Sequence, residues 1–278
     1  MRYDFIKMHG LGNDFIVLDA PARDGLVFSR AQWRALGDRH RGIGFDQALV
    51  LEPPRTTDSL AYYRIFNADG AEVEQCGNGV RCLAELLRLR GYARNGQVML
   101  DSPAGRITAN LGEPGMVSVD MGVPDFTPAA VAFDPAGQPG PLYAIDVQHQ
   151  RVEFLIASMG NPHAVIEVPN TATAPVGTLG AALESHPRFE RRVNVGFRQV
   201  RNRGHLRLRV FERGVGETQA CGTGACAAVA TGIRERVLDE RVQVDLPGGT
   251  LYVSWAGDNN PLWLEGPAEV SFTGHFDL

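Results

Sequence analysis

The sequence contains almost no lysine. Lys7, close to the N-terminus, is the only one among 278 residues. Enzymes that use pyridoxal phosphate hold that cofactor as a Schiff base with a lysine. Lys7 lies in a segment of alternating apolar residues, far along the chain from the cysteine motifs described below. The sequence therefore argues against pyridoxal phosphate chemistry.

Long apolar runs and an excess of positive charge are also missing. No segment approaches the roughly 20 consecutive apolar residues that a membrane-spanning helix needs, and the N-terminal stretch MRYDFIKMHG lacks the apolar core of a secretory signal. The formal net charge is −5 and the pI about 5.8, which argues against a general nucleic-acid binder. We therefore expect a cytoplasmic protein with no membrane or nucleic-acid partner, whose thiols stay reduced.

Cysteine is scarce, but the four cysteines reveal an internal repeat. The segment FNADGAEVEQCGNGVRC (66–82) aligns without a gap on FERGVGETQACGTGAC (211–226), which places Cys76 on Cys221. Three further matches keep the same order: Gly12-Asn13 with Gly160-Asn161, GFDQ (44–47) with GFRQ (196–199), and DSPAG (101–105) with DLPGG (245–249). Because such self-similarity decides the fold prediction, we expect two homologous domains.

The spacing of apolar residues predicts the secondary structure of both halves. Helices are expected at 29–40, from Gly77 to about Gly91, at 178–185 and at about 223–236, with strands between them. Strands outnumber helices, and their spacing is too short for βαβ units, so we expect an α+β fold with mostly antiparallel sheet wrapped around one main helix per domain. The five prolines of 124–141 indicate a linker or boundary. The expected domains are residues 1–122 and 123–269, with the tail 270–278 packed on the first.

Each Cys-Gly-x-Gly turn is expected to open a helix. The first amides of a helix have no partner within it, and this end carries partial positive charge. Both effects stabilise a thiolate, so the pKa of Cys76 and of Cys221 is expected to fall. The glycines let the backbone approach a bound carboxylate or phosphate closely.

Two such turns, brought face to face by homologous domains, would place one thiol on each side of a bound molecule. One thiolate removes an α-proton and the opposite thiol delivers another, which is what racemisation without a cofactor needs. His163, after the repeated Gly-Asn turn, and Glu212, which replaces Asn67 in the repeat, are further candidates. Arg213 suits a bidentate contact with a carboxylate. Glu72 and Glu217 match across the repeat and are expected to support the loops.

Other interpretations of the cysteines stay open. The Cys-x5-Cys and Cys-x4-Cys spacings fit a structural zinc site poorly, and a structural disulfide does not suit the cytoplasm. A disulfide between Cys76 and Cys221 on oxidation is compatible with a shared cleft. Gly222-x-Gly224-x-x-Ala227 fits a dinucleotide-binding pattern, but we expect no parallel βαβ context for it. Cys82 and Cys226 fit buried core positions inside the helices.

The motifs together resemble the diaminopimelate epimerase family over essentially the full length. They are HGLGNDF (9–15), GFDQ (44–47), FNADG and CGNGVRC (66–82), GNPH (160–163), NVGF (194–197) and ERGVGETQACGTGAC (212–226). The resemblance implies two similar domains, each a barrel-like antiparallel sheet around a central helix. It also implies epimerisation of LL- to meso-diaminopimelate for lysine and peptidoglycan synthesis, with no cofactor or metal, by a homodimer.

The resemblance also implies roles for individual residues. Cys76 and Cys221 correspond to the acid–base pair, His163 and Glu212 to residues that assist the thiols, and Phe272 to an aromatic at the dimer contact. Substrate contacts fall on Asn13, Gln47, Asn67, Asn161, Asn194, Glu212 and Arg213. They also fall on the turns Gly77-Asn78 and Gly222-Thr223, through the backbone amides of these turns around the reacting α-carboxylate. The nearest alternative is a proline racemase relative, although these tend to show Cys-Gly-His where this chain has Cys-Gly-Asn. A cysteine acyl-transfer enzyme, with Cys221 as nucleophile and His163 as base, would leave Cys76 unexplained.

Overall fold

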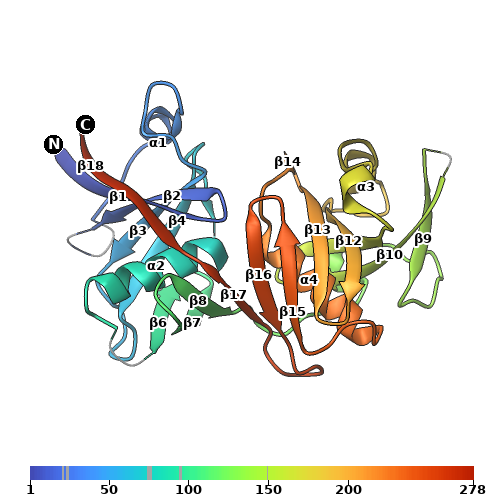
Figure 1. Ribbon diagram of the computed structural model, residues 1–278. Helices are drawn as coiled ribbons and strands as arrows, with labels where there is room; N and C mark the ends of the chain where they lie inside the picture. The colour runs from blue at the N-terminus through green and yellow to red at the C-terminus, as the bar shows by residue number, and fades with distance from the viewer. Residues whose placement is uncertain (21, 23–24, 74–76, 94–95, 149) are drawn as a thin grey trace. The chain divides into compact units, whose positions relative to one another are not determined.

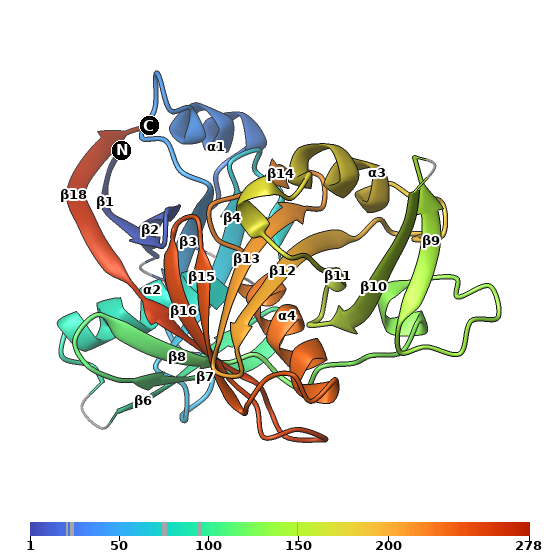
Figure 2. The same ribbon diagram turned by 45° about the vertical axis from the view of Figure 1, so that its right-hand side comes forward.

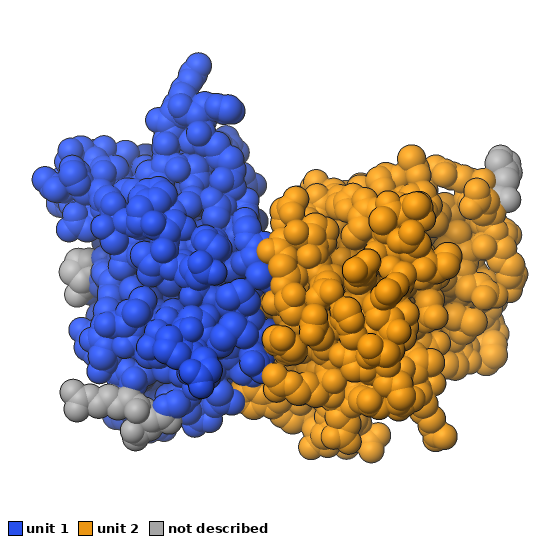
Figure 3. Space-filling view, in the orientation of Figure 1, with its two compact units in different colours: residues 1–120, 265–278 blue, residues 121–264 orange. Residues whose placement is uncertain are grey.

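The computed structural model describes residues 1–20, 22, 25–73, 77–93, 96–148 and 150–278. The chain forms two compact units, coloured separately in Figure 3. Unit 1 comprises residues 1–120 and 265–278, and unit 2 comprises residues 121–264. The first boundary lies two residues before the one expected from the sequence, and the second lies five residues earlier.

Unit 1 contains the first half of the repeat and the C-terminal strand. Its helices are α1 (Arg30–Gly37) and α2 (Gly77–Leu89). Its strands are β1 (Arg2–Gly10), β2 (Asn13–Asp19), β3 (Gln47–Glu52), β4 (Ala61–Asn67), β5 (Glu72–Val73), β6 (Gln97–Ser102), β7 (Gly105–Leu111), β8 (Met116–Asp120) and β18 (Glu269–Asp277). β17 (Trp263–Pro267) crosses the boundary between the units.

Unit 2 contains the second half of the repeat. Its helical segments are η1 (Ala129–Val131), η2 (Thr171–Thr173), η3 (Val176–Gly180), α3 (Ala181–Glu184) and α4 (Gly222–Arg234). Its strands are β9 (Tyr143–Val147), β10 (Gln150–Ser158), β11 (Pro162–Glu167), β12 (Asn194–Asn202), β13 (His205–Glu212), β14 (Gly216–Glu217), β15 (Arg241–Leu246) and β16 (Gly249–Ser254).

The strands pair in the same order in both units. In unit 1, β1–β2, β3–β4, β4–β5 and β6–β7 are antiparallel, whereas β2–β3 and β4–β6 are parallel. In unit 2, β10–β11, β12–β13, β13–β14 and β15–β16 are antiparallel, whereas β11–β12 and β13–β15 are parallel. The expected α+β fold with mostly antiparallel sheet is confirmed. The expectation of no parallel βαβ context was wrong. β4 and β6, which precede and follow α2 in the chain, pair in parallel. β13 and β15, which precede and follow α4, do the same.

One helix forms the centre of each unit. α2 packs against β1, β2, β7 and β8, and α4 packs against β10, β11, β12, β13 and β16 (Figures 1 and 2). The second glycine of each cysteine turn explains this close packing. A Cβ on Gly79 would lie 3.0 Å from a methyl group of Leu49, and one on Gly224 would lie 3.0 Å from a methyl group of Val210. Glycine therefore lets the first turn of each helix approach the sheet.

Backbone pairing fixes which residues of the two halves correspond. Phe66 and Phe211 align in the repeat. Phe66 pairs with Ala48 on β3, and Phe211 pairs with Val195 on β12. Ala48 and Val195 are therefore structural counterparts, which sets the register of β3 against β12.

This register corrects one of the sequence matches. It makes Gln47 the counterpart of Asn194, not of Gln199 as the GFDQ/GFRQ match (44–47 with 196–199) implied. The four-residue similarity misled because sheet position is set by backbone hydrogen bonds to neighbouring strands. The loop before each strand also differs in length between the halves.

The proline-rich segment 124–141 is not a linker. Asp125 forms a β-bridge with Ser158, while Val131 and Phe133 are buried in the core of unit 2. Phe133 packs against the ring of Phe189 with centroids 4.7 Å apart. The segment follows the boundary between the units at 120/121. The linker interpretation was wrong, because buried apolar side chains between the prolines anchor the segment, which includes η1, in unit 2.

The helix expected at 178–185 begins earlier than predicted. Its first part, η3, is a π-helix, and α3 continues directly from it to Glu184. In unit 1, the terminal strand β18 pairs antiparallel with β1 from Arg2, opposite Asp277, to His9, opposite Glu269. The two chain ends therefore lie side by side (Figure 1). Among the described residues, no helix is both long and apolar enough to cross a membrane.

Candidate active site

Cys221 occupies the N-cap position of α4. Its backbone is extended, with φ −119° and ψ 104°, and the residue is 3% exposed. The Sγ atom lies 3.7 Å from the Oγ1 atom of Thr223 and also contacts the amide of Gly224. The predicted position of this thiol at a helix start is therefore confirmed. Cys76, its counterpart in the repeat, lies outside the described residues.

The expectation of a lowered pKa at Cys221 was wrong. Burial raises the pKa of this thiol well above its ordinary value, and the negative charge of Glu212 acts in the same direction. Hydrogen bonds from Thr223 and Gly224 lower the pKa but only in part. Desolvation of a thiolate therefore outweighs the helix N-terminus, and Cys221 is a neutral thiol near pH 7.

His163, Asn161 and Thr223 form a hydrogen-bonded chain that ends at Cys221. Nε2 of His163 lies 3.0 Å from Oδ1 of Asn161, and Nδ2 of Asn161 donates to Oγ1 of Thr223 at 3.2 Å. His163 is 1% exposed, and burial, with the nearby charge of Arg213, lowers its pKa to about 3. A neutral His163 must donate from Nε2, because the facing Asn161 oxygen only accepts. The hydroxyl hydrogen of Thr223 is then available to the sulfur of Cys221.

Two buried side chains of unit 2 bind the backbone directly after Glu212, at Arg213 and Gly214. Oδ1 of Asn194 accepts the backbone N–H of Arg213 at 2.9 Å, and Oε1 of Glu184 accepts that of Gly214 at 2.9 Å. The carboxylate of Glu212 accepts a hydrogen bond from Thr218 and lies next to the thiol of Cys221, as its effect on that pKa requires.

Sequence reasoning missed Glu184. Its relative exposure is 3%, although a charged residue at the end of a short helix reads as a solvent-exposed position. Its burial was the missing signal, because a buried carboxylate needs partners. Glu184 finds them in the N–H of Gly214 and in Arg192, whose nearest guanidinium nitrogen lies 3.2 Å away.

In unit 1, the side-chain amides of four residues expected near the substrate form two hydrogen-bonded pairs. Nδ2 of Asn78 donates to Oδ1 of Asn13 at 3.0 Å, and Nε2 of Gln47 donates to Oδ1 of Asn67 at 2.9 Å. Asn78 is the second residue of α2 and is 6% exposed. Gly77 begins α2 and is partly buried. Asn13 and Asn78 therefore correspond to Asn161 and Thr223 of unit 2, where the same two positions also share a hydrogen bond.

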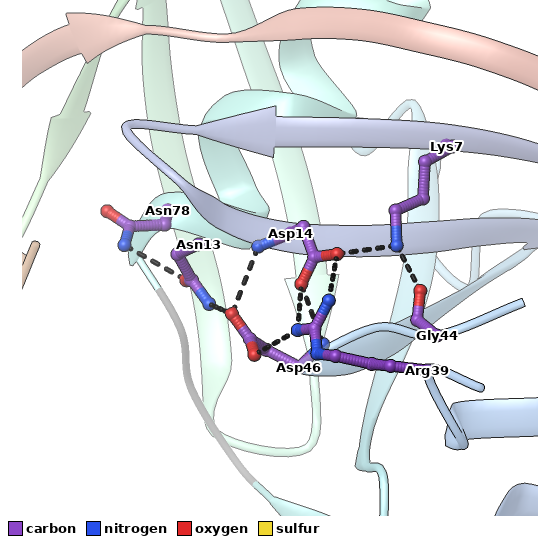
Figure 4. A network of polar contacts seen from close by, with 7 residues as sticks. All are labelled: Lys7, Asn13, Asp14, Arg39, Gly44, Asp46 and Asn78. Carbon is purple, nitrogen blue, oxygen red and sulfur yellow. Dashed lines mark hydrogen bonds and ion pairs between the residues drawn. The ribbon is translucent and has the colours of Figure 1, made fainter. Parts of the chain in front are cut away.

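A charged cluster behind Asn13 binds the single lysine. Nζ of Lys7 lies 2.6 Å from a carboxylate oxygen of Asp14 and donates to the carbonyl of Gly44. Arg39 binds Asp14 through two hydrogen bonds of 2.7 and 3.0 Å, and Asp46 at 2.7 Å (Figure 4). Burial raises the pKa of Asp14, but hydrogen bonds and charges from Arg39 and Lys7 outweigh it and bring that pKa to about 2.

Glu72 and Glu217 form matched ion pairs. Arg64 binds Glu72 with a shortest contact of 2.7 Å, and Arg209 binds Glu217 with one of 2.6 Å. The first pair joins β4 to β5, and the second joins β13 to β14. Each of these hairpins precedes a cysteine turn in the chain. These contacts match the loop-supporting interpretation of both glutamates. Cys82 and Cys226 are fully buried, which confirms their core positions.

Phe272 lies on β18, where its backbone pairs with Lys7 of β1. It is 50% exposed and contacts the ring of Phe5 edge to face, with centroids 6.0 Å apart. Its expected role at a dimer contact stays a prediction.

The geometry at Cys221 suits proton transfer next to a bound carboxylate. The amides of Gly222 and Thr223 belong to the first turn of α4, where amide hydrogens favour anions. A thiol at the N-cap of the same helix lies within two residues of those amides along the chain. A carbon bearing a carboxylate held there would have its proton within reach of sulfur.

Comparisons with known proteins give the same fold. A phenazine biosynthesis protein of the PhzF family from Bacillus anthracis matches with TM-score 0.71 and 17% identity over 100% of both chains. A hydroxyproline epimerase from Agrobacterium vitis, solved with bound trans-4-hydroxy-L-proline, matches with TM-score 0.68 and 15% identity over 99% of this chain and 92% of that one. A methylitaconate-Δ-isomerase matches with TM-score 0.65 and 14% identity, over 99% of this chain and 95% of that one.

These identities are too low to transfer a substrate, and they establish the two-domain fold alone. The sequence itself matches the family described as diaminopimelate epimerase over residues 5–127 and 155–271. That match covers both cysteine turns and both Gly-Asn turns, and it supports an epimerase or isomerase activity. The chain belongs to the diaminopimelate epimerase family.

Proposed function

We propose that the protein interconverts LL- and meso-diaminopimelate by a two-base mechanism that uses Cys76 and Cys221, in the cytoplasm and without a cofactor. The observation that carries the proposal is the buried thiol of Cys221 at the start of α4, next to Glu212 and Thr223, in a chain that belongs to this family.

The reaction breaks and forms one C–H bond. The thiolate of one cysteine takes the α-proton, which forms S–H and leaves the electron pair of the C–H bond delocalised into the α-carboxylate. The thiol of the other cysteine gives its proton to the opposite face of the carbon and becomes the thiolate. Such general acid–base groups each contribute about 10²–10⁴-fold to a rate.

The surroundings of Cys221 support its role as the proton donor in one direction. Its raised pKa keeps the proton on sulfur until the carbon becomes basic. After donation, the new thiolate meets the hydrogen of Thr223 and the amide of Gly224, both of which favour the charged form. The amides at the start of α4 would meanwhile stabilise the negative charge that develops on the carboxylate.

Neutral amide side chains support a zwitterionic substrate. Amide groups both donate and accept hydrogen bonds, so they can bind ammonium and carboxylate without adding charge next to the thiols. Asn13, Gln47, Asn67, Asn161 and Asn194 supply them.

Proton NMR of the reduced protein with LL-diaminopimelate in D₂O tests the proposal. We expect loss of the α-proton signal and deuterium in the meso product. Absence of exchange with diaminopimelate, together with exchange of proline or trans-4-hydroxyproline, would replace the substrate but leave the chemistry intact.

Cysteine variants test the two-base mechanism. Cys76→Ala and Cys221→Ala should each reduce turnover by at least about 10²-fold, while Cys226→Ala, a change within the same helix α4, should retain most of it. Near-normal turnover in either of the first two variants would show that the mechanism needs only one thiol or none.

A further inference from the structure

The amide chain in unit 1 has a fixed direction. Nδ2 of Asn13 donates to Oδ2 of Asp46 at 2.9 Å, and Oδ1 of Asn13 accepts from Nδ2 of Asn78 at 3.0 Å (Figure 4). An ionised carboxylate only accepts hydrogen bonds. Asn13 must therefore turn its NH₂ group toward Asp46 and its oxygen toward Asn78.

Asp46 is itself held as an acceptor. Its Oδ2 also accepts the backbone N–H of Asp14 at 3.1 Å, and its Oδ1 accepts from Arg39 at 2.7 Å. Arg39 in turn binds Asp14, which also pairs with Lys7. A charged and crosslinked carboxylate cannot exchange its acceptor for a donor, so the orientation of Asn13 follows from the cluster behind it.

The orientation of Asn13 in turn fixes that of Asn78, and it leaves the side-chain oxygen of Asn78 without a donor among the described residues. Because Nδ2 of Asn78 points to Asn13, Oδ1 points away from it (Figure 4). This oxygen is buried and has no hydrogen-bond partner in the described part of the chain. Buried polar atoms rarely lack a partner, and an acceptor at the start of α2 would be satisfied by a donor from a ligand.

The matching chain in unit 2 runs in the opposite direction. There Asn161 donates toward the helix turn, to Thr223, because His163 offers a hydrogen from behind. In unit 1 Asn78, in the first turn of α2, donates to Asn13, because Asn13 itself donates to the carboxylate of Asp46. Homologous positions thus end in a hydroxyl donor in one unit and in a carbonyl acceptor in the other.

We propose that Asp46 is a positioning residue that, through Asn13, presents the side-chain carbonyl of Asn78 as an acceptor for an ammonium group of the substrate. The ammonium assignment rests on the proposed function, because diaminopimelate supplies such a group. The direction of the hydrogen bonds from Asp46 to Asn78 does not depend on the proposed function. An ammonium group is a donor only, so it matches an acceptor whose orientation cannot reverse.

Kinetics of two variants test the ammonium contact. Asp46→Ala lets Asn13 turn over, so that Asn78 can present its NH₂ group instead of its oxygen. A hydrogen bond to a charged group is worth enough to raise KM about tenfold, with a smaller change in kcat. Adding Asn78→Asp, whose side chain has two acceptor oxygens, should return KM to within about threefold of the wild type. A KM in the double variant at or above that of Asp46→Ala would overturn the proposal.

Unfolding in denaturant, without substrate, tests the direction of the chain separately. Asn78→Asp alone should be strongly destabilised, because its oxygen faces the oxygen of Asn13, which Asp46 prevents from turning. The double variant should be less destabilised than the sum of the two single changes, because residues 46 and 78 are coupled through Asn13, which hydrogen-bonds both. Additive changes in unfolding free energy would overturn the proposed relay, by which we mean the orientation of Asn78 by Asp46 through Asn13.

Two controls separate the relay from simple charge effects. Asp19→Ala removes a bidentate ion pair with Arg90 in the same unit and should be additive with Asn78→Asp. The coupling between residues 46 and 78 should persist in about 1 M NaCl, where the Debye length is about 3 Å; loss of coupling there would count against the relay. If the wild type exchanges no proton of diaminopimelate, the proposed function and the ammonium assignment both fail, and the unfolding cycle alone decides the relay.

Discussion

Gln47 and Asn194 are structural counterparts in the two units, although they differ in residue type. Gln47 pairs with Phe15 across β2 and β3, and Asn194 pairs with His163 across β11 and β12. Gln47 donates to the side chain of Asn67, whereas Asn194 accepts the backbone N–H of Arg213. The duplicated backbone thus supports two different sets of polar contacts, and the differences lie at positions where substrate contacts are expected.

Glu212→Gln should lower the pKa of Cys221. The negative charge of Glu212 is one of the causes that raise this pKa, second to burial, and glutamine removes it while keeping the shape. The ultraviolet absorbance of the thiolate, measured against pH with Cys221→Ala subtracted, reports the change. An unchanged or higher pKa would show that Glu212 does not act on the thiol by its charge.

The same thiol makes stability depend on alkaline pH. The pKa of Cys221 is raised in the folded protein, so its contribution is fully present below the unfolded-state value of about 8.5 and is lost as pH rises through the folded pKa. The unfolding free energy of the wild type should therefore fall more steeply above pH about 8.5 than that of Cys221→Ala.

Asp14→Asn should remove a stabilising contribution at neutral pH. The pKa of Asp14 is about 2, against an ordinary 3.8, a difference worth about 2 kcal/mol. Because this pKa is lowered on folding, the contribution is present above pH 3.8 and is lost as pH falls through about 2. The gap in unfolding free energy between wild type and variant should shrink over that range. A gap independent of pH would exclude the ion pairs as its origin.

Glu184→Ala should impair substrate binding without touching substrate. Removing this carboxylate frees the N–H of Gly214 and loosens the loop that carries Glu212 and Arg213, so KM should rise several-fold. Loss of a hydrogen bond to a charged group should also lower stability by about 1.5–3 kcal/mol.

Glu184→Gln is the matched control, since its amide oxygen can still accept from Gly214 while the charge facing Arg192 is gone. The half-exposed Arg192 can turn into water. Equal KM values for the two variants would show that the hydrogen bond to the loop is not what matters.

Phe272→Glu should convert the expected homodimer to monomer. Phe272 is 50% exposed on β18, and a charge on a buried interface aromatic should raise the dissociation constant at least tenfold, or about 1.4 kcal/mol. Analytical ultracentrifugation measures this. Leu89→Glu, at a 56% exposed position of α2, should leave the oligomeric state unchanged. A monomeric wild type, or an unaffected dimer in Phe272→Glu, would contradict the prediction.

The repeat in the sequence predicted much of the fold. The pattern around Cys76 and Cys221 indicated two related halves, each with a helix after the cysteine turn, because helix starts and apolar periodicity are local properties of the chain. The core positions of Cys82 and Cys226 followed from the same periodicity.

Several features could not be read locally. The correspondence of Gln47 with Asn194 depends on backbone pairing between strands that are distant in sequence. The packing of 124–141 into unit 2 depends on burial of Val131 and Phe133, which proline content hides. The pKa of Cys221 depends on how completely water is excluded from the thiol. Here that exclusion raises the pKa by more than the groups at the helix N-terminus, which the motif predicts, lower it.

The sequence by itself determined the family, the duplicated α+β plan and the candidate residues, because all three are written in residue type and spacing. Only the tertiary structure decided the direction of the hydrogen bonds among those residues. Asn13 and Asn161 are the same residue type at matched positions of the repeat, yet they orient oppositely, since Asp46 accepts behind one and His163 donates behind the other. An amide has no preferred direction of its own, and its neighbours in space assign one.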